Sequence, residues 1–298
     1  MLQVLIDSAV RASELSLVAI GLSLTWGVAK FANIAHVQYA PLGAYLTLLF
    51  INMFALGLVV GALVAIVVTG LIGVLLYRAF FQRLVRASSA TALIGSLAIS
   101  IVITAGIQTV AGPRPRPLPL PIQPGITFGG AMITRTQLIV VAIAVAVLIA
   151  YFAGLMLTKV GRSIRCVMAN ADLAEASGID TARIKTHVFF VSGGMAALGG
   201  VLLAMDTTVS LDMGTVLLLP VVAAVIMGGV GSSAGSVAAA ALLALAENLI
   251  LDIDFGSLLG GETSYVPLNY SAAIGFVALI LVMLLRPQGI FGFGGRRA

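Results

Sequence analysis

Residues that could carry chemistry are few in this chain, and they lie far apart. The 298 residues include two histidines, His36 and His187, and one cysteine, Cys166. No Ser/His pair, paired carboxylates or His cluster is apparent, and one cysteine excludes an iron-sulfur cluster or a Cys-rich zinc site. The glycine-rich segment 227–236 is no phosphate loop, because no lysine follows it. We therefore expect no enzyme activity and no metal or cofactor bound by this chain.

A first group of polar residues interrupts an apolar stretch at 33–41, where Asn33, His36 and Gln38 precede Pro41. In lipid each unsatisfied polar group costs several kcal/mol, so this break must face protein or a water-filled cavity. We expect Asn33 to cap the next helix, and Pro41 to kink that helix or to leave a backbone carbonyl free. Two interpretations stay open: a pathway or gate element near the inner end of the helices, and structural hydrogen bonds between helices.

A second interruption lies between 220 and 248. Pro220 predicts a kink, and a tight turn follows in which four glycines let helices approach closely: Gly228, Gly229, Gly231 and Gly235. Further on, Glu247 beside Asn248 needs a partner or a wet cavity. Together with Asn33, His36 and Gln38, these two residues are the candidates for a translocation pathway.

The long charged segment at about 159–185 contains a predicted short helix. Asn170 can cap it, Asp172 lies in its first turn, and Gly178 can end it. Four small residues would form a flat face of this helix: Ala169, Ala171, Ala174 and Ala176. Leu173 and Ile179 would project from the helix as apolar side chains. Such a helix is suited to insertion into a groove on a soluble partner. The alternative is an amphipathic helix that rests on the membrane surface.

Composition places these residues in a membrane protein. Apolar residues make up 60% of the chain and charged residues 9%, against about 25% charged in soluble domains. A soluble enzyme, a disordered chain and a nucleic-acid binder are therefore excluded, although the pI is near 9.7. No cleavable signal peptide is apparent, because Asp7, Arg11 and Glu14 interrupt the region where its apolar core would lie.

Charges divide the chain into intervals that mostly fit one helix across a bilayer core of roughly 30 Å. Two longer intervals, 30–78 and 212–247, each require a hairpin, which gives nine hydrophobic passes. Six of the ten prolines lie at about 111–125 and predict an extended, polyproline-like outer loop, a spacer or a docking rim. We expect one transmembrane domain over 1–298.

The positive-inside rule orients these passes. With the N-terminus outside, 12 of the 16 basic residues lie on the cytoplasmic side: Lys30, Arg78, Arg83, Arg86, Lys159, Arg162, Arg165, Arg183, Lys185, Arg286, Arg296 and Arg297. If the interval 212–247 were re-entrant instead, the C-terminus would move outside and the bias would weaken. The sequence therefore predicts an outer N-terminus and a cytoplasmic C-terminus.

Four motifs in order resemble those of the branched-chain amino acid ABC transporter permeases, LivH-like subfamily, over essentially the whole chain. In chain order they are segment 21–27 followed by Asn33-Ile34-Ala35-His36, segment 161–169 with 174–179, Gly228-Gly229-Val230-Gly231-Ser232 with Gly235, and segment 286–292. The sequence departs from the family pattern at Ile34 and Val37, where the family has Phe and Gly. It also departs at Glu14, which would place a carboxylate near the outer mouth.

The resemblance implies an all-α, type II-like importer permease of about eight to nine transmembrane helices or half-helices, in a bacterial inner membrane. This subunit would form half of the pathway, with a second homologous permease or a copy of itself. Two ATPase subunits would carry ATP and Mg, and a periplasmic or extracellular solute-binding protein would deliver the solute. The expected ATPase-coupling residues are Gly161, Arg162, Arg165, Ala169, Asp172, Leu173, Ala174, Glu175, Gly178 and Ile179.

The solute stays open between hydrophobic or branched-chain amino acids, amides or urea, and small carboxylates. The competing function is a stand-alone secondary transporter or channel, which would need its own intramembrane ion-coupling site. Only Glu247 lies deep enough in the predicted topology to serve such a site.

Overall fold

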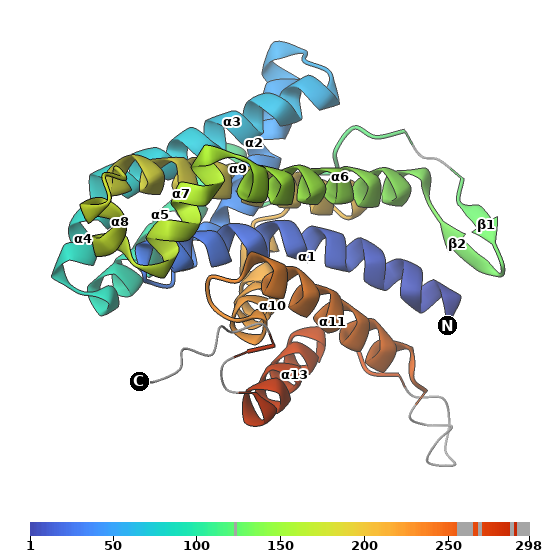
Figure 1. The fold of residues 1–298 in the computed structure, drawn as a ribbon. Coiled ribbons are helices and arrows are strands. Elements are labelled where there is room, and N and C mark those ends of the chain that lie inside the picture. The colour runs from blue at the N-terminus through green and yellow to red at the C-terminus, as the bar shows by residue number, and fades with distance from the viewer. Residues whose placement is uncertain (122–123, 255–264, 268–269, 287–288, 291–298) are drawn as a thin grey trace.

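The structure is a computed structural model that describes residues 1–121, 124–254, 265–267, 270–286 and 289–290. Arg296 and Arg297, and residues 287–288 and 291–292 of the last motif, lie outside this range. The described chain is mostly helical (Figure 1). Helices are the expected form in lipid, because each satisfies its backbone hydrogen bonds within one segment.

Nine apolar helices match the nine predicted passes within the described residues. Seven are long and apolar enough to span a membrane: α1 (Leu2–Ala29), η1–α2 (Ile34–Gln38 and Tyr39–Phe54), α3–η2–α4 (Leu58–Leu76, Tyr77–Phe81 and Gln82–Ala87), α5 (Ser89–Ala111), α6 (Arg135–Leu157), α9 (Thr181–Asp206) and α11 (Ser233–Asp252). Two are shorter: α10 (Met213–Gly228) and α13 (Ser271–Leu285). The all-helical membrane fold is therefore confirmed, while a full crossing by α10 and by α13 stays a prediction.

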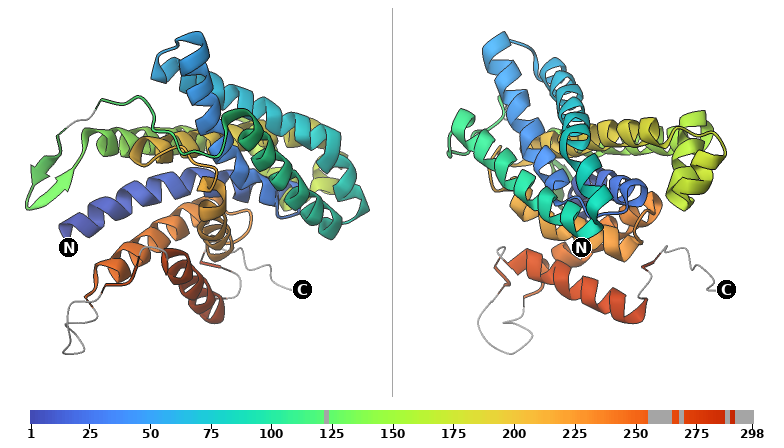
Figure 2. Two further views of the ribbon diagram at one scale, coloured as in Figure 1. Left: turned by 180° about the vertical axis from the view of Figure 1, so that it is seen from behind. Right: turned by 90° about the vertical axis from the view of Figure 1, so that its left-hand side faces the viewer.

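Helix α1 is the centre of the bundle and packs most extensively against α11 and α9 (Figures 1 and 2). From Ser13 to Ala29 every residue of α1 is buried except the half-buried Trp26. In contrast, only Val140 and Ala144 are buried in α6. The exposed helix α6 is also the more apolar of the two, as expected for a helix with few protein neighbours in a membrane.

Glycines bring α9 close to its neighbours. A methyl group at Gly200 would overlap the Ala40 carbonyl of α2, and one at Gly70 of α3 would lie 2.9 Å from the Phe190 carbonyl. Lipid supplies little hydrophobic force between helices, so close backbone contact of this kind holds them together. The glycines of α9 therefore serve helix packing.

The segment 33–41 follows the expectations only in part. Asn33 occupies the N-cap position of the short 3₁₀ helix η1, but its side chain makes no capping hydrogen bond. Pro41 is the third residue of α2, in the first turn, where a backbone N–H has no helical acceptor. Pro41 is thus compatible with the start of a helix rather than the cause of a kink within one.

A small hairpin outside the helices was not predicted. Strands β1 (Ile126–Phe128) and β2 (Ala131–Ile133) pair antiparallel through Gly129 and Gly130, both at positive φ, as a two-residue hairpin turn requires. The hairpin lies beside the N-terminal end of α1 (Figures 1 and 2). Before it, the backbone of Arg116 exchanges two 3.0 Å hydrogen bonds with Val209. The proline-rich loop is therefore anchored to the bundle there.

Candidate functional site

The predicted contact helix forms as expected. Helix α8 (Ala171–Ala176) follows α7 (Lys159–Ala169), at the end of the bundle opposite the hairpin (Figures 1 and 2). The Asn170 side chain accepts a 3.0 Å hydrogen bond from the Leu173 backbone N–H, and Asp172 lies in the first turn. Gly178 has a φ of 84°, which favours glycine. The Asn170 cap, the Asp172 charge and Gly178 therefore define a helix of about one and a half turns between α7 and α9.

The exposed face of α8 differs from the expectation. Leu173 is 65% exposed, but Ala174 is only 4% exposed and packs into an apolar cluster with Leu24 and Val28 of α1. Of the other candidates, Gly161 is buried, Arg165 and Ile179 are half-buried, and five are exposed: Arg162, Ala169, Asp172, Glu175 and Gly178. A partner can therefore reach Leu173 and the charged residues, whereas Ala174 anchors the loop to the bundle.

Helix α7 was missed by the sequence reasoning. It begins at the Thr158 cap, whose hydroxyl accepts a 3.0 Å hydrogen bond from the Gly161 N–H. Ile164 and Val167 face the bundle, and at its end the Met168 carbonyl accepts a 2.7 Å hydrogen bond from Lys30 Nζ. Apolar residues at 164, 167 and 168 have the i, i+3, i+4 spacing that could have revealed this helix.

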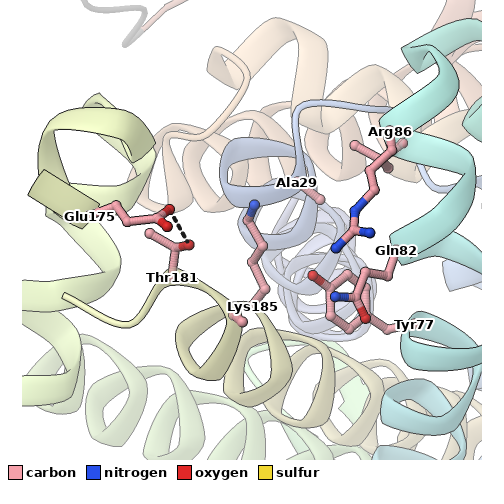
Figure 3. Close-up of a pocket in the computed structure, with 9 residues that line it drawn as sticks. Ala29, Tyr77, Gln82, Arg86, Glu175, Thr181 and Lys185 are labelled. Carbon is pink, nitrogen blue, oxygen red and sulfur yellow. Dashed lines mark hydrogen bonds between the residues drawn. The ribbon is translucent and has the colours of Figure 1, made fainter.

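A polar pocket of about 270 Å³ lies next to α8, between α4 with η2 and the start of α9 (Figure 3). Arg86 and Lys185 contribute positive charge to it. On the α8 side, the Thr181 hydroxyl donates a 3.2 Å hydrogen bond to the Glu175 carboxylate. The surface around α8 thus combines an exposed leucine with charges of both signs.

The glycine-rich turn lies at this same end. Gly229 and Gly231 have φ values of 95° and 85°, and a methyl group at Gly228 would overlap the backbone of Gly235. The backbone N–H of Ile290 donates a 2.7 Å hydrogen bond to the Met227 carbonyl. The predicted tight turn is therefore present, and Gly289 and Ile290 of the C-terminal motif lie against it. Pro220 lies inside α10, which is helical from Met213 to Gly228, and the kink expected there stays a prediction.

His36 lies deep in the bundle rather than near an inner helix end. It is fully buried, with Nε2 3.1 Å from the Val18 carbonyl of α1 and Nδ1 3.3 Å from the Ser192 hydroxyl of α9. Asn33 and Gln38 are also buried, and a methyl group at Gly214 of α10 would overlap the Gln38 amide. These three residues stay candidates for the pathway, and in this conformation they pack between helices.

At the opposite end a cavity of about 720 Å³ lies among α1, α9, α10 and α11. It contains Glu247, Asn248 and Pro220, which the sequence singled out. Its other polar residues were missed as members of one site: Asp7, Arg11, Glu14, Gln137, Asp206, Thr207, Thr208, Ser210 and Thr215. Its volume is typical of a small-molecule site.

Three charges meet inside this cavity. Arg11 Nε lies 3.7 Å from a Glu247 oxygen, and Arg11 Nη1 lies 3.8 Å from a Glu14 oxygen. Glu14 and Glu247 are only 2% and 4% exposed. The second oxygen of each, Oε1, is buried and has no hydrogen-bond partner. Arg11 thus forms ion-pair contacts with both buried carboxylates.

The sequence did contain a signal for this cluster. Asp7, Arg11 and Glu14 are spaced i, i+4, i+7 in an otherwise apolar helix, so they share one face. That face meets α11, which supplies Glu247. Among the described residues no group of three or more His, Cys, Asp or Glu side chains is placed to hold a metal ion.

Comparison with known proteins identifies relatives along the whole chain. LivH of Escherichia coli K12, a high-affinity branched-chain amino acid transport system permease protein, is 25% identical over 98% of this chain and 95% of its own. BraD of Pseudomonas aeruginosa, described in the same words, is 24% identical over the same shares. A probable branched-chain amino acid transport permease, LivH of Methanocaldococcus jannaschii, is 26% identical over 97% of this chain and 92% of its own.

The fold has a counterpart among solved structures. PsaBC from Streptococcus pneumoniae, in complex with Fab, aligns with a TM-score of 0.51 over 96% of this chain and 92% of its own, at 11% identity. That likeness concerns the fold alone. The family model of the branched-chain amino acid transport system permease component matches residues 4–284, and this multi-pass membrane chain therefore belongs to that permease family.

Proposed function

We propose that this permease is half of the translocation pathway of an ATP-driven ABC importer for hydrophobic or branched-chain amino acids or a related small polar solute. The observation that carries the proposal is the arrangement of two sites on one central helix. Helix α1 contributes to the polar cavity at one end and contacts the α7–α8 loop at the other. A partner that moves α8 would therefore act on a helix that also lines the cavity.

The expected partners follow from family membership. A second permease or a copy of this chain completes the pathway, two ATPases that carry ATP and Mg bind at the α7–α8 end, and a solute-binding protein docks at the cavity end. On the ATPase side the contact residues are Leu173 and its exposed neighbours. The type II-like arrangement of such an importer belongs to this proposal.

The pathway begins in the outer cavity at Glu247 and Asn248. Asn33, His36 and Gln38 lie further along it, where α1, α9 and α10 must separate before a solute can pass. Pro220 has no N–H for the Val216 carbonyl, and both residues line the cavity. The carbonyl that this leaves without a helical donor is a further polar group for a solute.

Reconstitution tests this function. The chain, its partner permease and the ATPases are placed in liposomes, with the cognate binding protein and labelled leucine outside. We expect uptake that requires ATP inside the liposomes, and no uptake when the ATPases are omitted or a hydrolysis-deficient ATPase is used. Uptake without ATPases that follows an ion gradient would contradict the proposal.

That contrary outcome would support a secondary transporter, for which the structure supplies one favourable observation. Arg11, Glu14 and Glu247 place three charged groups within helices apolar enough to span the membrane. Intramembrane charges of this kind are typical of ion-coupled transporters. Omission of the ATPases from the same liposomes decides between the two functions.

A further inference from the structure

Two buried carboxyl groups, Glu14 and Glu247, share the single guanidinium of Arg11. With all three ionised, two carboxylates face one guanidinium. The contacts at 3.7 and 3.8 Å are longer than normal hydrogen bonds. A buried charge is costly unless it is paired and hydrogen-bonded, so this cluster can accept one further cation.

The geometry leaves acceptor atoms for that cation. Oε1 of Glu14 and Oε1 of Glu247 are both buried and without a hydrogen-bond partner, on side chains that are 3% and 5% exposed. Beside Glu247, α13 contributes Gly275, where a methyl group would lie 3.4 Å from this oxygen. Gly275 thus adds no side chain between α13 and this oxygen.

The surroundings favour an organic cation over a bare ion. No metal-binding group is found among the residues that the structure describes. Apolar side chains line the same cavity as the carboxylates: Val10, Leu203, Met213, Val216, Leu219 and Leu251. An ammonium group donates three hydrogen bonds, while an alkyl chain attached to it would pack on these apolar side chains.

We propose that Glu14 and Glu247 form a site in the permease itself that binds the protonated amine of the transported solute. The inference rests on the proposed import function and narrows it. Selection then lies partly in this chain, because amides, urea and carboxylates without an amine lack the cation that the two carboxylates require. Arg11 contacts both carboxylates, partly neutralises them and competes with the amine for them.

Binding to the purified full-length chain, without ATPases or ATP, tests this site separately from transport. The probes share one branched carbon skeleton and differ in their polar group: 3-methylbutan-1-amine, 4-methylpentanamide and 4-methylpentanoate. Dissociation constants come from the concentration dependence of the thermal unfolding midpoint. We expect the amine to raise the midpoint of the wild-type chain and the amide and carboxylate to leave it unchanged.

Single-residue variants test which side chains bind the amine. Glu14→Gln and Glu247→Gln keep the side-chain shape and should each weaken amine binding at least about tenfold. Asp252→Asn, an exposed acid on α11 outside the cavity, is the control and should bind like the wild type. Arg11→Gln removes the competing cation and should tighten amine binding, whereas misfolding of a variant would weaken it.

Three results would overturn the proposal: equal stabilisation by the amine and the amide, unchanged amine binding in both Gln variants, or the same stabilisation by sodium chloride alone. Failure of ATP-driven uptake would leave this binding result intact, and failure of amine binding would leave ATP-driven uptake intact. The two hypotheses are therefore separable.

Discussion

Lys30 Nζ donates a 2.7 Å hydrogen bond to the carbonyl of Met168, which joins the end of α1 to the last turn of α7. Lys30 itself has a left-handed backbone conformation, with φ 59° and ψ 29°, and its N–H bonds the Trp26 carbonyl. A cation at a helix C-terminus also interacts favourably with the helix dipole. This contact links the loop that carries α8 directly to the central helix.

Loss of that link should uncouple the loop from the bundle. We expect Lys30→Met to change the free energy of unfolding by less than about 1 kcal/mol, because the lysine is exposed. Uptake per ATP hydrolysed in liposomes should fall several-fold. Lys30→Arg is the control, since it keeps a donor and should retain most of the coupling. Equal coupling in the Met and Arg variants would show that the hydrogen bond is dispensable.

Leu173 and Ala174 should respond in opposite ways. Leu173→Ser removes an exposed apolar side chain, so the thermal midpoint should stay near the wild-type value while ATP-dependent uptake falls. Ala174→Trp overfills a buried position and should cost about 1–3 kcal/mol or more of stability.

Val160→Ser on α7 is the matched control, because Val160 is also exposed and lies outside α8. It should leave uptake unchanged. Cross-linking from position 173 should reach an ATPase in the assembled complex. Absence of that cross-link, or an equal loss of uptake in the Val160 variant, would exclude α8 as the contact.

The close approach of Gly228 and Gly235 should not tolerate a methyl group. A side chain at 228 would overlap the backbone of the facing helix start, so we expect Gly228→Ala to lower stability by about 1–3 kcal/mol. Gly106→Ala is the control, since nothing lies within 4 Å of the added methyl group there. Thermal unfolding of the two purified variants compares them, and equal midpoints would contradict the packing argument.

His36 should behave as a buried hydrogen-bonding residue in this conformation. His36→Ala leaves a cavity and removes the partner of Val18 and Ser192, which should cost about 2–4 kcal/mol. Ser192→Ala should cost about 1 kcal/mol. Because His36 also lies on the proposed pathway, His36→Ala should lower transport more than it lowers expression or the thermal midpoint. A loss of transport in proportion to the loss of stability would assign His36 a purely structural role.

Labelling of the native Cys166 thiol tests the orientation of the chain in the membrane. Cys166 is exposed on α7, on the face that the positive-inside rule places in the cytoplasm. In intact cells an impermeant maleimide should not label it, and permeabilisation should expose it. Pro117→Cys in a Cys166→Ser background, at an exposed position of the proline-rich loop, should react in intact cells. The reverse pattern would invert the proposed topology.

Local residue patterns were enough to predict several elements. Charge spacing predicted the apolar helices, because a bilayer core sets the length that each must have. Asn170 and Gly178 predicted the ends of α8, because capping and left-handed geometry depend on residues adjacent in sequence. The tight turn at Gly229 and Gly231 was predicted for the same reason.

Tertiary structure alone decided which polar residues meet. Arg11 and Glu247 are 236 positions apart, and only the packing of α1 against α11 brings them together. Ala174 was expected at a partner surface, but the docking of α7 and α8 on the bundle buries it. His36 follows a non-helical segment, and no periodic pattern in the sequence indicates how deep in the bundle that segment lies. The sequence by itself determined that this chain is a helical membrane protein and where its local caps and turns lie, since those depend on near neighbours and on solvent. The burial and partners of each polar side chain depend on contacts between distant segments, which the three-dimensional packing alone establishes.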